Sequence, residues 1–431
     1  MQGCVICKKG ISSDNLQCWT RWIQMVMDDG GVLDRMKKSE TLPREGNRKD
    51  SDWDKLPDDL HSHILAHLPI PSIIRSRAVC RGWGCMILSQ EFKRLHETLS
   101  PKGKPWLFVC SSYDCRENSC AYDPNFNVWR ILPLTFIPVS MRFPLIAAGG
   151  LLFIKGAYQD SSKQSKYSLS RLTVCNPITK MWTVLPPMIR TRLNFLIGII
   201  EDSIQNSFKV IIAGGISESG GDYECTTELY DSITNSWSIT GPMPREYTVQ
   251  TTVWASKTVY CKRKLFCLIS AKPSKIISYD IEKKIWEEVK IPQPEGLFSS
   301  FLVQRRGNLL LIGDVRYQNV CQRVAIWELK GGDAQSSIEK LYWSELVQIP
   351  SCYVQRFCKG AKDFNVKCVG NDDMLYFFKD SHSEILLCDL SCSPTTWSWL
   401  PHCPLSNGLL KFSVRALLVE PTLYGATLTK K

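Results

Sequence analysis

The sequence predicts a small all-α domain of three short helices, followed by an all-β propeller of six blades. Residues 51–99 carry apolar residues at helical spacing, in three runs separated by prolines and polar residues. Residues 100–420 show no long helical periodicity and consist of short β-rich runs bounded by Gly, Pro, Asn and Ser. A phrase that contains tryptophan recurs in this part about every 50 residues, the period of a four-stranded propeller blade.

Composition indicates a soluble globular protein. The 431 residues are 44% hydrophobic and 22% charged, which excludes wholesale disorder. No apolar run approaches the ~18 residues of a membrane span, and the N-terminus lacks the pattern of a secretory signal. The 19 cysteines are odd in number and scattered, which favours a reducing compartment over a disulfide framework. We therefore expect the protein in the nucleus, the cytoplasm or both.

The net charge of +11 does not by itself indicate a nucleic-acid partner, because the 53 Lys and Arg residues are dispersed along the chain. Basic pairs such as Lys283-Lys284 and Arg305-Arg306 are typical of hairpin turns. We interpret them as solvated surface, and expect neither nucleic acid nor membrane as a partner.

Four regions follow one another along the chain. Residues 1–50 are polar and irregular, and we expect a flexible leader. Cys4 and Cys7 in this leader have no second cysteine pair at the spacing of a zinc site, so no metal is expected there. The helical domain covers residues 51–99, the propeller covers 100–420, and residues 421–431 form a C-terminal tail.

The first helix of this domain begins at Leu56-Pro57-Asp58-Asp59, because proline is favoured in the first turn and acidic side chains are stabilised at the positive end of the helix dipole. Pro69 and Pro71 end the first helix. Three short helices cannot shield all the large apolar side chains here from water. The surplus predicts an exposed surface that binds a helical partner. The three apolar stripes are Leu60, Ile64, Leu65 and Leu68; Ile70, Ile73 and Ile74; and Ala78, Val79, Trp83, Met86 and Ile87.

Each copy of the repeat is an apolar strand ending in a small polar residue, a turn, a tryptophan and an exit with proline. In the third copy these are Asp231, Trp237 and Met243-Pro244. We expect the Asp or Asn to cap the turn between the third and fourth strands, and the tryptophan to pack between neighbouring blades. The tryptophans are Trp129, Trp182, Trp237, Trp286, Trp343 and Trp397, at intervals of 53, 55, 49, 57 and 54 residues.

One strand is left over at the end of the chain. Blades two to six each show four candidate strands, whereas the first copy shows three, at 106–110, 119–122 and 128–131. The orphan strand at 412–419 completes this blade if it lies beside 106–110. Such closure removes the exposed sheet edges that an open array could not tolerate. We therefore expect a six-bladed ring closed by a C-terminal strand.

The helical domain contains the pattern Trp53-x-x-Leu56-Pro57-x-x-Leu60-x-x-x-Ile64-Leu65-x-x-Leu68-Pro69, continued by Arg75-x-Arg77-x-Val79-Cys80-x-x-Trp83. This pattern closely resembles the F-box. The repeats resemble degenerate kelch blades, although only Gly214-Gly215 follows a second strand and Gly149-Gly150 falls one strand earlier. Over residues 53–420 the chain resembles the plant F-box/kelch-repeat proteins, the group that includes Unusual Floral Organs-like proteins.

The resemblance implies a substrate receptor of SCF (Skp–cullin–F-box) ubiquitin ligases. In this role the F-box binds a Skp-family adaptor, and through it a cullin, while the propeller binds the protein to be ubiquitinated. Two alternatives stay open: the F-box residues form only a small core packed on the propeller, or the chain is a scaffold that binds the adaptor without promoting ubiquitination. The residues that would dock on the adaptor or support docking are Leu56, Pro57, Leu60, Ile64, Leu65, Leu68, Ile73, Val79, Cys80 and Trp83.

The predicted substrate-binding face carries the loops between second and third strands and the loops between blades, which are the longer loops. Arginines recur in the loops between blades, and they would favour an acidic or phosphorylated degron because arginine binds carboxylates and phosphates bidentately. Arginine here is also part of the general kelch pattern and can instead bind loop carbonyls. The fourth blade breaks the series with Gln293 and Glu295. The arginines are Arg142, Arg190, Arg192, Arg245 and Arg356.

The six histidines do not indicate a catalytic or metal site. His63 and His67 stand one helical turn apart, but no acidic or thiol ligand is placed to complete a metal site, and we interpret them as solvent-facing. The propeller has only His382 and His402, too few for the copper site of a kelch oxidase. We expect no catalytic residue, no metal and no cofactor. The contribution to ubiquitin transfer would be to position a substrate.

Overall fold

The structure is a computed structural model of the chain. It describes residues 56–423 except 101–102, 112–114, 138–139, 158–169, 203–204, 206, 218–220, 249–257, 270–274, 319, 332–340, 359–365, 380–383 and 407–413. The predicted leader and most of the predicted tail lie outside the described residues. The chain divides into two compact units, Met1–Gly103 and Lys104–Lys431.

The first unit has four helices among its described residues: α3 (Asp58–Ala66), α4 (Ile70–Ser76), α5 (Arg81–Leu88) and α6 (Gln90–Leu99). Pro57 and Pro69 stand directly before α3 and α4, where the missing proline N–H leaves no helical hydrogen bond unmade. Ser89 caps α6, since its hydroxyl accepts a hydrogen bond from the backbone N–H of Phe92 at 3.0 Å.

Helix α6 is one more than the three helices that the sequence predicts. Phe92, Leu95 and Leu99 recur in it at helical spacing, but polar residues dominate the segment and obscure the stripe. The helix packs against α3 and α5. Phe92 is as buried as Leu65 of α3, so α6 supplies part of the small core of this unit.

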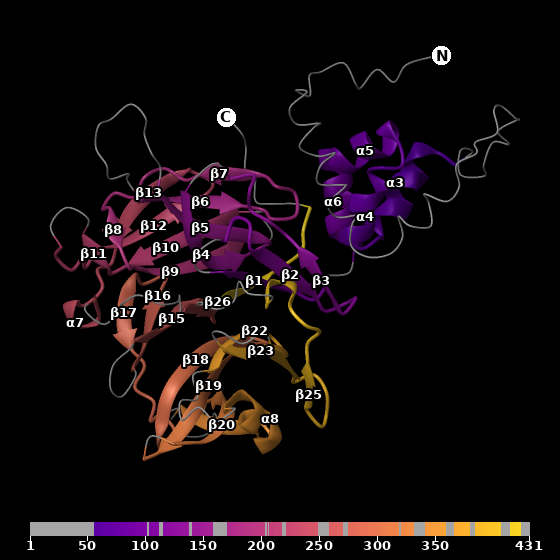
Figure 1. The fold of residues 1–431 in the computed structure, drawn as a ribbon. Coiled ribbons are helices and arrows are strands. Elements are labelled where there is room, and N and C mark those ends of the chain that lie inside the picture. The colour runs from indigo at the N-terminus through magenta and orange to yellow at the C-terminus, as the bar shows by residue number, and fades with distance from the viewer. Residues whose placement is uncertain are drawn as a thin grey trace, which may run out of the picture. The chain divides into compact units, whose positions relative to one another are not determined.

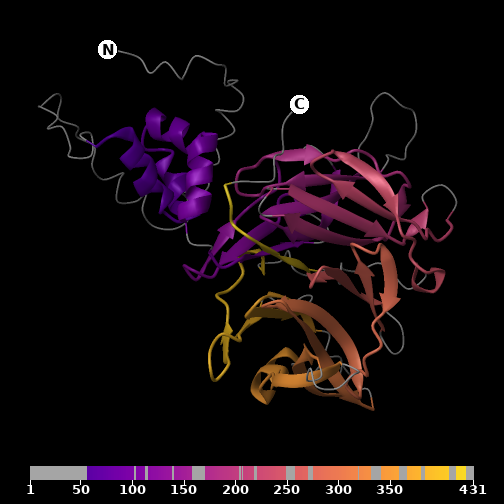
Figure 2. The same cartoon turned by 180° about the vertical axis from the view of Figure 1, so that it is seen from behind.

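The second unit is a ring of six four-stranded sheets, as predicted (Figure 1). Figure 2 shows the same ring from behind. The strands of each blade are given from the inner to the outer one. The first blade has β26 (Val414–Val419), β1 (Trp106–Ser111), β2 (Ser119–Asp123) and β3 (Val128–Ile131), and the second has β4 (Ser140–Ala148), β5 (Leu151–Ala157), β6 (Ser170–Cys175) and β7 (Trp182–Val184). The third blade has β9 (Leu196–Asp202), β10 (Ser207–Ala213), β12 (Thr227–Asp231) and β13 (Ser236–Thr240), and the fourth has β14 (Thr258–Cys261), β15 (Lys264–Ile269), β16 (Lys275–Asp280) and β17 (Ile285–Glu288). The fifth blade has β18 (Leu297–Arg305), β19 (Asn308–Tyr317), β20 (Val320–Lys330) and β21 (Tyr342–Gln348), and the sixth has β22 (Val366–Asn371), β23 (Met374–Lys379), β24 (Ile385–Asp389) and β25 (Thr396–Trp399).

The C-terminal strand closes the ring, which confirms the prediction. Strand β26 pairs antiparallel with β1, from Trp106 opposite Val419 to Ser111 opposite Val414. The seam between the first and sixth blades is further held by Trp129, whose indole N–H donates to the carbonyl of Pro401 at 2.8 Å. Because β26 comes from the far end of the sequence, the last strand of the chain holds the first blade in place.

The polar residue and the tryptophan of the repeated phrase cap a turn and contact the neighbouring blade, as in the third blade. The carboxylate of Asp231 accepts the backbone N–H of Ile233 at 2.8 Å, and that of Asp280 accepts the N–H of Lys283 at 2.9 Å, so the polar residue caps the turn into the fourth strand. The indole of Trp237 donates to the carbonyl of Pro186 in the preceding blade at 2.9 Å. Five of the six predicted tryptophans pack against clusters between blades, and Trp182 of β7 is half-buried outside them; the five are Trp129, Trp237, Trp286, Trp343 and Trp397.

Four smaller elements lie between the strands of the blades: β8 (Arg192–Leu193), β11 (Ile216–Ser217), α7 (Arg245–Thr248) and α8 (Ser351–Cys358). A 3-10 turn, η2 (Pro404–Ser406), follows the last blade. Within the described part of the chain, every helix is too short or too polar to cross a membrane.

Candidate functional site

The first unit, Met1–Gly103, which carries the predicted F-box and is called the F-box unit below, exposes part of its apolar side chains to solvent. Leu60 and Ile64, four residues apart on one face of α3, are 48% and 44% exposed, and Val79 before α5 is 65% exposed. Large apolar side chains that stay this exposed on so small a unit indicate a binding surface. Among the other residues predicted to contact the adaptor, Pro57 and Cys80 are exposed, Leu56, Leu68 and Trp83 are half-buried, and Leu65 and Ile73 are buried.

The buried residues of the predicted set, Leu65 and Ile73, can only support docking, because the core encloses them. His96 of α6 lies in the same interior, with its Nε2 3.3 Å from the carbonyl oxygen of Leu68. Burial lowers the pKa of His96, and the hydrogen bond to Leu68 opposes that shift in part. The neutral imidazole therefore belongs to the folded state of this unit.

Histidines on α3 divide into two environments. His63 and His67 are exposed, whereas His61 is buried and does not face solvent. Within the described residues, no three His, Cys, Asp or Glu side chains come together in a way that could hold a metal ion.

The cysteines inside the propeller strands behave as small apolar residues, as their sequence context predicts. Burial raises the pKa of Cys388 to about 12 and raises the pKa of Cys267 further. Thiols in this state are protonated at neutral pH and are poor nucleophiles.

One face of the propeller, here called the loop face, carries the loops between second and third strands and the loops between blades. Strands alternate in direction within each sheet, so second and fourth strands end on the same side. The elements β8, β11, α7 and α8 all lie in such loops. Much of the loop at 157–170, which the sequence marks as long, is outside the described residues.

Arg192 is not available to a substrate, which corrects the prediction. Its side chain is fully buried and forms an ion pair with the equally buried Glu228 of β12. Its guanidinium also donates to the carbonyl of Thr226 at 2.7 Å and to the Thr226 hydroxyl at 2.6 Å. Burial lowers the pKa of Arg192, and the charges of Glu228 and Glu224 oppose that shift. This arginine binds loop carbonyls, the structural role left open by the sequence.

Arg142 also differs from its predicted place. It stands within strand β4 and not in a loop between blades, at a point where the pairing register with β5 shifts between Met141 and Phe143. The sequence around it is apolar enough to continue the strand, and a bulge accommodates the extra residue.

Three predicted arginines do reach the loop face. Arg190 is exposed just before β8, and Arg245 is exposed at the start of α7. Arg356 of α8 pairs with Glu384 at 2.5 Å and lies over the ring of Trp399, 4.5 Å from its centroid. The hydrogen bond that Arg356 donates to Glu384 raises the pKa of Arg356, so this guanidinium is held in place by its own neighbours.

A further arginine on this face was not predicted. Arg316, near the end of β19, lies 3.7 Å from the ring centroid of Phe298 and pairs with the buried carboxylate of Asp314 at 2.5 Å. Phe298 is 55% exposed. The stacking joins residues on two strands, which the spacing of arginines along the sequence does not reveal.

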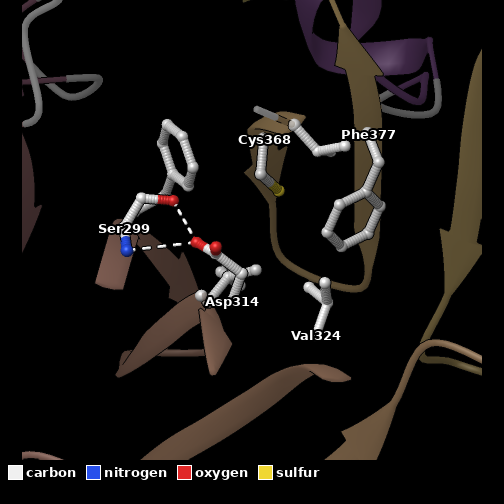
Figure 3. A pocket seen from close by; sticks show the side chains of 9 residues that line it. Ser299, Asp314, Val324, Cys368 and Phe377 are labelled. Atoms are coloured by element: carbon white, nitrogen blue, oxygen red, sulfur yellow. Dashed lines mark hydrogen bonds between the residues drawn. The ribbon is translucent and has the colours of Figure 1, made fainter. Parts of the chain in front are cut away.

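Asp314 also lines a small cavity between the fifth and sixth blades (Figure 3). Its carboxylate accepts the backbone N–H of Ser299 at 3.0 Å and the hydroxyl of the same residue. Val324, Cys368 and Phe377 make the other walls apolar. The space suits about one water molecule and not a substrate or cofactor.

Comparison with known proteins agrees with this arrangement. Residues 53–95 match the F-box domain family. The chain is 26% identical to F-box only protein 6 of Arabidopsis thaliana, over 84% of this chain and 72% of the relative. It is 27% identical to Protein UNUSUAL FLORAL ORGANS of the same plant, over 82% of this chain and 80% of the relative. It is 23% identical to SKP1-interacting partner 15 of A. thaliana, over 82% of this chain and 94% of the relative.

Other relatives from this plant are named F-box/kelch-repeat proteins, at 25% identity over 82% of this chain. The protein is therefore an F-box domain joined to a six-bladed propeller, and over most of its length it is a homologue of proteins that include UNUSUAL FLORAL ORGANS and F-box/kelch-repeat proteins.

Proposed function

We propose that this protein is the substrate-recognition subunit of an SCF-type ubiquitin ligase, acting in the nucleus, the cytoplasm or both. Its F-box binds a Skp-family adaptor, and through it a cullin, while the propeller binds the protein to be ubiquitinated. Support comes from the match of residues 53–95 to the F-box and from a homologue whose name records interaction with SKP1.

The observation that carries the adaptor half is the exposed apolar surface of the F-box. Roughly half of Leu60 and of Ile64, and more of Val79, is open to solvent. Burying a fully exposed side chain of this kind is worth about 1.5–3 kcal/mol, and covering the exposed part of each of these three gains about half of that or somewhat more. Proteins rarely keep such a patch without a partner.

The propeller half rests on the loop face. Its exposed Arg190 and Arg245 favour a substrate with acidic or phosphorylated residues, because guanidinium groups pair with carboxylates and phosphates. Arg192 no longer belongs to this set, and Arg356 is already paired with Glu384. The role is one of positioning: a bound substrate is held at high effective concentration beside a conjugating enzyme carried elsewhere in the complex.

The test is co-purification with a purified Skp-family adaptor. We expect Ile64→Asp and Leu60→Asp to lose the adaptor, because each puts a charge into the apolar surface without disturbing the buried core. Ile233→Asp makes the same chemical change at a 62% exposed isoleucine of the propeller, and should bind as the wild type does. Circular dichroism verifies that all variants are folded. A folded wild type that does not bind the adaptor contradicts the proposal.

The alternative is a scaffold that binds the adaptor without turnover of a substrate. The two are separated by reconstituting the ligase with adaptor, cullin and conjugating enzyme. Cullin-dependent ubiquitination of a protein held by the propeller supports the receptor, and binding of that protein without ubiquitination supports the scaffold.

A further inference from the structure

Two strands outside the blades, β8 and β11, form a small sheet on the loop face of the third blade. Ile216 of β11 pairs with Leu193 of β8 on one side and bridges to Tyr223 on the other. Directly paired residues in antiparallel strands point to the same face, with Cβ atoms about 5 Å apart. Leu193, Ile216 and Tyr223 therefore form one apolar row, the apolar platform. Leu193 is 38% exposed and Tyr223 is 43% exposed.

The opposite face of the platform is anchored by a buried charge pair. Side chains alternate along β8, so Arg192 points inward where Leu193 points outward. Arg192 is held by Glu228, by Thr226 and, at 3.3 Å, by the carbonyl of Gly214. The Glu228 carboxylate also accepts the backbone N–H of Ile189 at 2.8 Å and that of Arg190 at 2.9 Å. The segment 189–193 is therefore fixed by its own hydrogen bonds before any partner arrives.

Glycine lets β11 approach β8 closely enough to pair. Gly215 has φ +99°, a left-handed conformation that side chains rarely adopt, and a Cβ atom there would lie 2.5 Å from the carbonyl oxygen of Leu193. The N–H of Glu224 donates to the carbonyl of Gly215 at 2.9 Å, which fixes the third segment of the small sheet. The result is an exposed apolar surface whose backbone is held in place by its own hydrogen bonds.

The charges around the platform are asymmetric. Arg190 is exposed at one end, next to the 48% exposed Ile189, and its guanidinium forms no ion pair with any residue that the structure describes. At the other end, Asp222 is exposed and precedes Tyr223. A ligand that covers the apolar row and carries a negative charge is therefore attracted at the Arg190 end.

From this geometry we propose that the apolar platform, with Arg190, is the docking site for a short extended segment of the substrate. The segment places a bulky apolar side chain over Leu193, Ile216 and Tyr223, and a carboxylate next to it on Arg190. This docking site adds detail to the proposed function and depends on it for one point, that the bound partner is a substrate of the ligase. The buried pair of Arg192 and Glu228 positions the surface and does not touch the ligand.

The test selects peptides from a phage-displayed library of short random sequences on the purified full chain. We expect the selected peptides to share an acidic residue close to a bulky aliphatic or aromatic one. A fluorescent copy of a selected peptide should bind Leu193→Asp at least about tenfold more weakly than the wild type. Ile233→Asp, in the turn between β12 and β13 on the opposite face, serves as the matched control and should leave the affinity unchanged.

Charge reversal gives a second and independent readout. Arg190→Glu alters an exposed side chain and should weaken the acidic peptide about tenfold, while a peptide with lysine in place of the acidic residue gains affinity. Selected peptides without an acidic residue, equal binding to wild type and Leu193→Asp, or a library that enriches no sequence would each overturn the proposal.

The two proposals fail in different ways. Adaptor co-purification is measured on the same preparations, and Leu193→Asp and Arg190→Glu should retain the adaptor. A chain that selects acidic–apolar peptides but binds no adaptor keeps the docking site and refutes the ligase role. A chain that binds the adaptor and selects no peptide keeps the ligase role and refutes this docking site.

Discussion

The two units of this protein complete their apolar cores in different ways. The propeller buries them between blades, as in the cluster that joins Ile312 of β19 to Phe377 of β23, and then closes its ring with β26. The F-box unit buries Leu65 and Ile87 but leaves Leu60 and Val79 largely in solvent. The ring gives each blade two neighbours that cover its faces and leaves only short outer edges, whereas four short helices cannot enclose all their own apolar surface.

The difference indicates where each unit obtains its stability. The propeller is completed by its own last strand, so its fold depends on the chain alone. The F-box unit leaves apolar surface exposed, so we expect part of its stability to be linked to binding of the adaptor.

The largest effect is expected from removing the closing strand. A chain that ends before Val414 leaves β1 with a free edge and opens the cluster at the seam of the ring. We expect loss of soluble, cooperatively folded propeller, measured by size-exclusion chromatography and thermal unfolding.

The matched control is a chain that ends after Leu423, which keeps β26 and the hydrogen bond from Asn176 to the carbonyl of Thr422 at 3.0 Å. It should remain folded. If both truncated chains unfold with the same cooperativity as the full chain, the propeller does not depend on its closure.

A smaller but still large effect is expected inside the third blade. Arg192→Leu leaves the Glu228 carboxylate buried without its counter-charge, and should lower the free energy of unfolding by about 3–5 kcal/mol. Denaturant unfolding measures the change. The double variant Arg192→Leu/Glu228→Leu should recover part of the loss, because it removes the unpaired charge. A single variant as stable as the wild type would show that this pair does not anchor the loop face.

Acid should weaken the F-box unit more than the propeller. Because burial lowers the pKa of His96, the unfolded chain takes up a proton more readily than the folded one. The stability from the neutral ring is complete above the ordinary histidine pKa of about 6.5, and declines as the pH falls below it toward the lowered pKa. In the propeller, by contrast, His402 is exposed to solvent and is not enclosed in the core as His96 is.

The measurement is the melting of the helical signal at about pH 7.5 and about pH 5.5 in wild type and His96→Gln. The variant should show a smaller difference between the two pH values, since glutamine can still donate to Leu68 but does not titrate there. An unchanged pH dependence in His96→Gln would assign the acid sensitivity to other groups.

The smallest effect is expected at the exposed ion pair of Arg263 and Glu282, whose side chains are 79% and 68% exposed. Arg263→Ala should change the free energy of unfolding by less than about 1 kcal/mol, because solvent screens such a pair. Comparing this change in the free energy of unfolding with that of Arg192→Leu under the same conditions shows how much the contribution of an ion pair depends on its burial. A loss as large as that of Arg192→Leu would remove the distinction.

Much of the architecture can be read from local patterns. The tryptophan period and the surplus strand at 412–419 predict the number of blades and the closure, because each blade repeats one supersecondary unit. Helix α6 escapes prediction because Phe92 and Leu99 stand among polar residues. The blade repeat and the apolar stripe of α6 are both patterns along the sequence, but the stripe of α6 is the weaker of the two.

The candidate site on the propeller is harder to predict, because burial depends on distant residues. Arg190 and Arg192 look alike in sequence, yet only the Arg192 side chain forms an ion pair with Glu228 of β12 and becomes buried. The stacking of Arg316 on Phe298 likewise joins two strands. The spacing of arginines therefore indicates a basic face, and the tertiary pairing decides which of them a substrate can reach.

Whether a partner completes the F-box is most directly tested by hydrogen–deuterium exchange of the full chain, with and without a purified Skp-family adaptor. Exchange reports the opening of individual elements, and binding slows it where the partner covers or stabilises the chain. We predict slower exchange confined to the F-box, centred on α3 and the segment from Val79 to Trp83, with the propeller strands unchanged. Unchanged exchange in α3 at saturating adaptor, or slowing confined to the propeller, would contradict the claim that this F-box is completed by its partner.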